Sequence, residues 1–144
     1  MIALVLVPGA RLDASEALKS VVSSYLDIQA RLFRDNMDGV NAAAASIVRQ
    51  AEGMGAGGTA IVKAATALEQ AKDLKAAREA FGSLSDSVIA AGNAEGWKDV
   101  PDVREAYCPM AKKSWLQKEA GIRNPYFGPA MPTCGSFKER TGKS

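Results

Sequence analysis

Two cysteines, each followed or preceded closely by a methionine, are the residues of this sequence with the most specific chemistry. Cys108 stands two residues before Met110 in "YCPMAKKSW", and Met131 stands three residues before Cys134 in "MPTCG". The sequence contains no other cysteine and no histidine. Thiolate and thioether are soft ligands, which select copper(I) or silver(I) over magnesium, calcium or manganese. These four residues are therefore the candidate ligands of a soft-metal site.

The same two cysteines allow two other interpretations. A disulfide between Cys108 and Cys134 would close a loop of about 27 residues and stabilise the fold by roughly 3 kcal/mol, as is common in an oxidising compartment. Two unrelated buried thiols are the third alternative. A thiol oxidoreductase is disfavoured because the pair lacks the Cys-x-x-Cys spacing that lowers a thiol pKa. Both the disulfide and the metal site require the two cysteines to lie close together in the fold.

The composition excludes several classes of function. The absence of histidine removes the commonest general base and every Ser-His or Cys-His dyad. Most hydrolase mechanisms are therefore not expected. The net charge of +2 is too small to indicate nucleic-acid binding, and no basic stripe with interleaved aromatics is present. The apolar run near the N-terminus is too short to span a bilayer, so no membrane span is expected.

Four segments have the apolar spacing of amphipathic helices. Residues at three- and four-position intervals recur over 14–34, 40–54, 59–68 and 74–91, and Asp73 is a suitable N-cap for the last of them. No segment shows the alternating β-branched pattern of a strand. The sequence therefore predicts an all-α fold, an antiparallel bundle of about four helices with short connections.

The character of the chain changes after Trp97, where prolines and glycines become frequent. We predict an irregular tail over 97–137, with at most one short helical piece near 113–118. Aromatic residues in this tail are expected to pack it against the bundle, because disordered tails are poor in aromatics. Residues 14–144 are thus predicted to form a single domain. Residues 1–13 have a truncated apolar stretch without a basic part, which we interpret as the remnant of a signal peptide.

The tail also carries a longer motif, "YCPMA…WL…IRNPYFG..M.TCG". This motif resembles the ending of a bacterial domain-of-unknown-function family. That family is found alone or as the C-terminal domain of periplasmic adaptor subunits of copper and silver efflux pumps. The resemblance extends to "LKAAREAFGSLSDSVIAA" over 74–91 and, less specifically, to "VVSSYLDIQARLF" over 21–33. This sequence departs from the family in having no histidine in its second and third helical segments and a shorter loop after "CPMA".

The resemblance implies an exported, periplasmic helical domain that associates with heavy metals and has no enzymatic activity. Cys108, Met110, Met131 and Cys134 would carry the copper(I) or silver(I), and a heavy-metal efflux adaptor or another periplasmic protein would be the partner. The alternative function is a helical protein-interaction domain without metal, stapled by a disulfide between Cys108 and Cys134. The methionines distinguish the two functions, because a disulfide makes no use of them.

Overall fold

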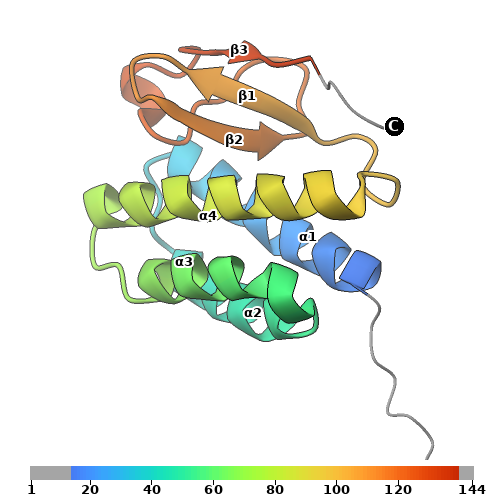
Figure 1. Cartoon of the computed structure of the whole chain (residues 1–144). Coiled ribbons are helices and arrows are strands. Elements are labelled where there is room, and N and C mark those ends of the chain that lie inside the picture. Colours follow the sequence, from blue (N-terminus) through green and yellow to red (C-terminus); the bar gives the residue numbers. More distant parts are fainter. Residues whose placement is uncertain (1–13, 140–144) are drawn as a thin grey trace, which may run out of the picture.

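The computed structural model describes residues 14–139, which form four α-helices and a small antiparallel sheet. Helices α1 and α4 lie in the middle, with the sheet on one side and the pair of α2 and α3 on the other (Figure 1). The elements are, in chain order, α1 (Ala14–Phe33), α2 (Val40–Glu52), η1 (Gly55–Gly58), α3 (Thr59–Glu69), α4 (Leu74–Glu95), β1 (Arg104–Cys108), β2 (Lys113–Gln117), η2 (Gly128–Ala130) and β3 (Ser136–Phe137). The predicted signal-peptide remnant, residues 1–13, lies outside the described residues.

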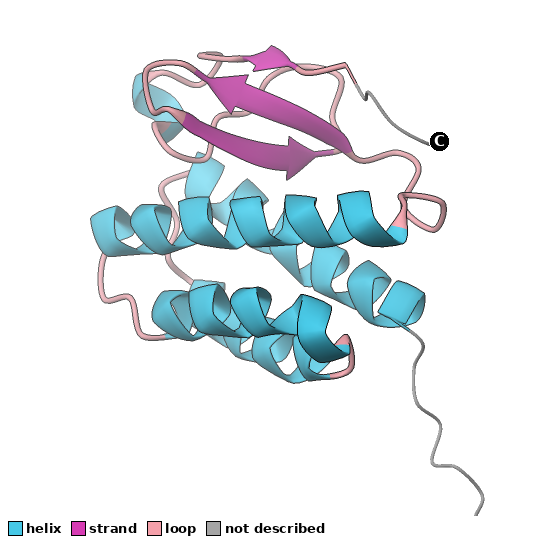
Figure 2. Ribbon diagram, in the orientation of Figure 1, coloured by secondary structure: helices cyan, strands magenta, loops and turns pink. Residues whose placement is uncertain are grey.

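The prediction of an all-α bundle with an irregular tail is wrong. A three-stranded antiparallel sheet in the order β2-β1-β3 lies within the predicted tail, and its strands are the magenta arrows of Figure 2. Strand β1 pairs with β2 along its full length, and Tyr107 of β1 stands opposite Ser136 of β3. The piece near 113–118, predicted to be helical, is strand β2. The prolines that argue against a helix all fall outside the strands, so they do not interrupt the ladder.

The predicted helical segments are present, with small shifts at their ends. Helix α4 begins after Asp73, whose carboxylate accepts a hydrogen bond from the N–H of Ala76 at 2.8 Å. This N-cap satisfies one of the N–H groups that a helix leaves free at its start. The helix continues to Glu95, past the predicted end, and Gly96 stops it with φ at 90°. A positive φ of this kind is adopted readily by glycine.

Aromatic side chains join the helical layer to the sheet. Phe81 of α4 is completely buried and stacks on Tyr25 of α1, with ring centroids 4.7 Å apart. Phe81 also contacts Tyr126 at 5.9 Å, and Trp115 of β2 meets Tyr126 edge to face at 6.0 Å. Phe81 therefore faces α1. Aromatic pairs in such offset and edge arrangements stabilise a fold by more than the burial of their surface area alone.

A buried hydroxyl also connects the layers. The Tyr25 hydroxyl lies 2.6 Å from Ser85 Oγ and accepts a hydrogen bond from the N–H of Leu116, at 3.0 Å. Burial raises the pKa of Tyr25 far above its ordinary value, so the hydroxyl stays protonated. The contact between Tyr25 and Leu116 spans 91 positions of the chain. One oxygen therefore links α1, α4 and β2.

Replacing Tyr25 with phenylalanine should lower the free energy of unfolding by about 1–3 kcal/mol, because the N–H of Leu116 loses its acceptor inside the core. Urea denaturation followed by circular dichroism measures the change. Tyr107→Phe is the matched control, since the Tyr107 hydroxyl has no hydrogen-bond partner among residues 14–139. Equal effects of the two substitutions would mean that the buried hydroxyl contributes nothing specific.

One hydrophobic core runs through both layers. Its buried side chains extend from Ala17 in α1 to Tyr126 beyond β2. Helix α4 contributes to both sides, since it packs on α3 and on β2. Within residues 14–139, no helix is both long enough and apolar enough to cross a membrane.

Candidate functional site

The sheet brings the two cysteines into contact. Cys108 is the last residue of β1, and Cys134 lies in the turn that leads into β3. Because Tyr107 pairs with Ser136, the antiparallel register places Cys108 opposite the residues that precede β3. The two Sγ atoms are 2.8 Å apart, and both thiols are free. The cysteines therefore meet, as both the metal site and the disulfide require.

The turn between β1 and β2 surrounds the sulfur of Cys108 with donors. The Cys108 sulfur accepts a hydrogen bond from the N–H of Ala111 at 3.4 Å, and the N–H of Met110 also contributes. The turn is closed by the N–H of Lys112, which donates to the Cys108 carbonyl at 2.8 Å. Lys112 has φ at 56°, a conformation that side-chain-bearing residues adopt infrequently. Pro109 has no N–H, so the turn's donors come from the three residues after it.

These contacts shift the pKa values of the two thiols in opposite directions. Burial raises the pKa of Cys108, but the hydrogen bonds from Cys134, Ala111, Met110 and Asn124 outweigh it, so the net pKa is below the ordinary value. The hydrogen bond to Cys108 raises the pKa of Cys134, as do burial and the negative charge on Cys108. The pair therefore holds its first negative charge on Cys108, while Cys134 donates its proton to that sulfur.

The two methionines belong to the turns that carry the thiols, and both are exposed. Met110 is 66% exposed and Met131 is 38% exposed, and they are the exposed large hydrophobic residues of the chain between residues 14 and 139. A backbone hydrogen bond of Met110 acts to lower the pKa of each thiol. The carbonyl of Met131 accepts from the N–H of Cys134 at 3.3 Å. Both methionines thus belong to the turns that carry the thiols. Their use as ligands stays a prediction.

Asn124 is a site residue that the sequence analysis missed. Its side chain is completely buried. Its Nδ2 donates to the Cys134 carbonyl at 2.8 Å, and its Oδ1 accepts from the N–H groups of Tyr126 at 2.8 Å and Phe127 at 3.1 Å. The only signal in the sequence is the Asn-Pro pair at 124–125, which is typical of a turn and says nothing about the thiols.

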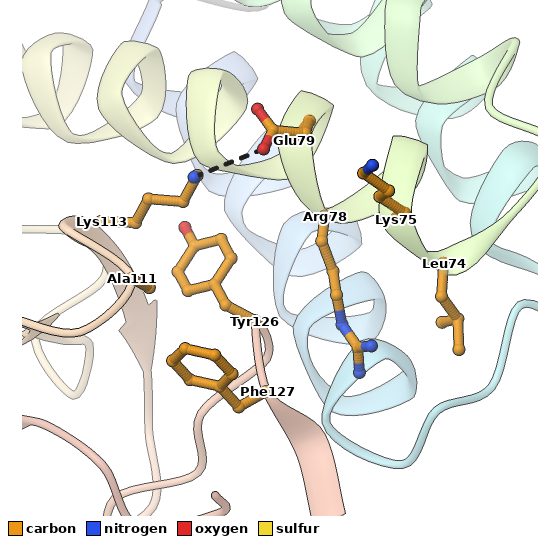
Figure 3. A pocket seen from close by; sticks show the side chains of 8 residues that line it. All are labelled: Leu74, Lys75, Arg78, Glu79, Ala111, Lys113, Tyr126 and Phe127. Atoms are coloured by element: carbon orange, nitrogen blue, oxygen red, sulfur yellow. Dashed lines mark ion pairs between the residues drawn. The ribbon is translucent and has the colours of Figure 1, made fainter. Parts of the chain in front are cut away.

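A cavity of about 490 Å³ opens next to the thiol turn, between the start of α4 and the segment that precedes η2 (Figure 3). Ala111, whose N–H binds the Cys108 sulfur, forms part of its wall. Lys113 reaches across to Glu79 at 3.8 Å, and Arg78 donates to the carbonyls of Leu32 and Pro125, both at 2.8 Å. The charged groups of this cavity therefore hold the two layers together.

The remaining donors do not enlarge the candidate site. Among residues 14–139, no three side chains drawn from aspartate, glutamate and cysteine cluster closely enough to hold a metal ion. A metal site at Cys108 and Cys134 would thus have two thiolates, with the thioethers of Met110 and Met131 as the additional ligands. This donor set suits copper(I) or silver(I) and is poor for zinc, which prefers four nitrogen, oxygen or thiolate ligands.

The comparisons with known proteins do not identify the chain. It matches no family model, no curated protein and no solved structure. The resemblance of the "YCPMA…TCG" motif to the efflux-associated family therefore stays a prediction.

Proposed function

We propose that this protein binds copper(I) or silver(I) as cargo, through the thiolates of Cys108 and Cys134 and the thioethers of Met110 and Met131. The observation that carries the proposal is the meeting of two free thiols, 2.8 Å apart, on turns that also carry two exposed methionines. The exposure of both side chains leaves them accessible to an ion in solvent. A soft ion in water is the species that such sulfur atoms bind.

The sulfur atoms must separate to admit an ion. A metal–thiolate bond of about 2.3 Å places two sulfurs roughly 4.6 Å apart across a linear ion. The observed separation of 2.8 Å is shorter. Cys108 is completely buried and held by neighbouring N–H groups, whereas Cys134 is partly exposed and lies in a turn. Movement of the turn that carries Cys134 would open the site.

The proposal includes an exported, periplasmic location and transfer of the ion to a heavy-metal efflux adaptor. Both rest on the motif resemblance. The arrangement supports binding without catalysis: the buried thiolate of Cys108 is inaccessible to a large substrate, and the more exposed Cys134 has the raised pKa. That distribution is unfavourable for thiol–disulfide exchange with other proteins, since the attacking thiol must be both accessible and ionised.

The second candidate function is a disulfide-stapled interaction domain without metal. The observation that favours it is the same short sulfur–sulfur distance, because thiols already in contact need little rearrangement to form a bond. The disulfide would close the loop of about 27 residues and contribute roughly 3 kcal/mol. Here Met110 and Met131 would have no part in the site.

Titration of the reduced protein with silver(I), followed by calorimetry, tests the proposal. Wild type should bind one ion, and the double variant Met110→Leu, Met131→Leu should bind it about tenfold more weakly, a loss of about 1.4 kcal/mol. Leucine nearly conserves the volume of methionine, so the fold should lose less than about 1.5 kcal/mol of stability.

The matched control is Met37→Leu, Met54→Leu, which makes the same chemical change at two methionines packed against the core. It should leave the silver affinity unchanged. Equal affinity of wild type and the Met110, Met131 variant would show that these methionines are not ligands. No binding by reduced wild type would rule out the metal function and leave the disulfide candidate.

A further inference from the structure

Asn124 connects the aromatic segment before η2 to the turn that precedes Cys134. Its backbone N–H donates to the carbonyl of Pro132 at 2.9 Å, and its carbonyl accepts from the N–H of Gly128 at 3.0 Å. Its Oδ1 accepts from Tyr126 and Phe127. These bonds fix the amide firmly against the aromatic segment, while the bond to Pro132 ties the turn before Cys134 to the same point.

The two hydrogens of the Asn124 amide nitrogen reach both cysteines. One is donated to the carbonyl of Cys134, with a distance of 2.8 Å between the heavy atoms. A hydrogen bond from the same side chain is also among the contacts that lower the pKa of Cys108. A single planar amide therefore touches one cysteine through its backbone and the other through its sulfur. No buried side-chain nitrogen or oxygen among residues 14–139 is left without a hydrogen-bond partner, as is usual for buried polar groups.

We propose that Asn124 is the positioning residue of the thiol site: it sets the separation of the two sulfur atoms and keeps an N–H donor on the Cys108 sulfur. The part of this inference that concerns an ion rests on the proposed function. The part that concerns the thiols holds whether or not the protein binds metal. Partners of this kind, which orient ligands without touching the ion, commonly change metal affinity by about 10–100-fold when removed.

Gln29 of α1 provides a matched control, because it holds the same loop. It is also a buried amide, and its Nε2 donates to the carbonyl of Arg123 at 2.8 Å. Arg123 immediately precedes Asn124, so Gln29→Ala loosens the same loop but removes no contact with either cysteine. The comparison separates a specific effect on the thiols from general weakening of the loop.

The first experiment measures the equilibrium of the purified protein with glutathione disulfide. Oxidation joins Cys108 and Cys134 by one S–S bond, and the two electrons and two protons reduce one glutathione disulfide to two glutathione thiols. Asn124→Ala should lower this equilibrium constant about tenfold, because the two thiols are no longer held together. Asn124→Asp keeps an acceptor for Tyr126 and Phe127 and, as a carboxylate, removes the donor to the Cys134 carbonyl, so it should shift the equilibrium in the same direction.

The second experiment titrates the same reduced proteins with silver(I). Asn124→Ala should bind about 10–100-fold more weakly than wild type, and Gln29→Ala should match wild type in both experiments. Effects confined to the Asn124 variants support the inference. Wild-type values for the Asn124 variants in both experiments would overturn it, as would an equal loss in Gln29→Ala. If wild type binds no silver, the proposed function fails, and the glutathione equilibrium alone decides the role of Asn124.

Discussion

Phe81→Ala should lower the free energy of unfolding by about 3–5 kcal/mol, a large share of the roughly 5–15 kcal/mol that stabilises a typical domain. Phe81 is completely buried and lies between Tyr25 and Tyr126, with ring centroids 4.7 and 5.9 Å away. Its removal leaves a cavity at the junction of α1, α4 and the segment before η2. The aromatic contacts across that junction are lost with it.

Urea denaturation of wild type and variant measures this loss. Both the midpoint and the dependence of the unfolding free energy on urea concentration are compared. Phe33→Ala is the matched control, because Phe33 ends α1 and is only partly buried. It should cost clearly less than Phe81→Ala. A midpoint for Phe81→Ala equal to that of wild type would contradict the packing described for this side chain.

Cys108→Ser should weaken silver(I) binding by the reduced protein roughly 100-fold. Structural zinc binds four-ligand peptides with a free energy of about 10–16 kcal/mol, or roughly 3 kcal/mol for each ligand. A loss of this size in binding free energy corresponds to a roughly 100-fold change in affinity. Serine replaces a soft sulfur with a hard oxygen at the same position. Its hydroxyl can still accept the N–H of Ala111, so the turn is expected to persist.

Competition titration against a dye of known silver affinity measures the change, and Cys134→Ser should give a loss of similar size. Ser136→Ala, two residues from Cys134 on exposed β3, is the control and should bind like wild type. Undiminished affinity in Cys108→Ser would exclude this thiol as a ligand and, with it, the proposed site.

The helices could be predicted because burial on one face of a helix leaves a clear period in the sequence. In α4, Ala77, Phe81, Leu84 and Val88 are all buried and follow three- and four-residue steps. Asp73 was also identifiable as the cap from its position before this run. Apolar spacing and capping are properties of neighbouring residues, so they predict where these helices lie without knowledge of the rest of the fold.

The strands could not be predicted in the same way, because their stability comes from distant partners. Strand β1 contains no β-branched residue, and β2 ends in three consecutive buried residues, so neither alternates cleanly. The turn that joins them has Lys112 at positive φ, where glycine or asparagine would have indicated a hairpin. The density of prolines then suggested an irregular chain, although the prolines only border the strands.

The candidate site, too, could be predicted from the sequence only in part. Residue type alone singled out Cys108 and Cys134, since thiols are rare and chemically distinctive. Their contact depends on the pairing of β1 with β3, which the sequence did not reveal. Asn124 escaped notice because asparagine is common in turns, and its role depends on which groups the fold places around its amide.

The exposure of Met110 makes the proposed site vulnerable as well as accessible. Oxidants convert methionine to its sulfoxide, in which a polar, chiral group replaces the apolar thioether. Met110, at 66% exposed, is open to such attack, whereas the sulfur of Cys108 is covered. The sulfoxide is no longer a soft thioether ligand, and methionine sulfoxide reductases are the enzymes that restore it. The capacity of the site for soft ions would therefore depend on repair of its methionines.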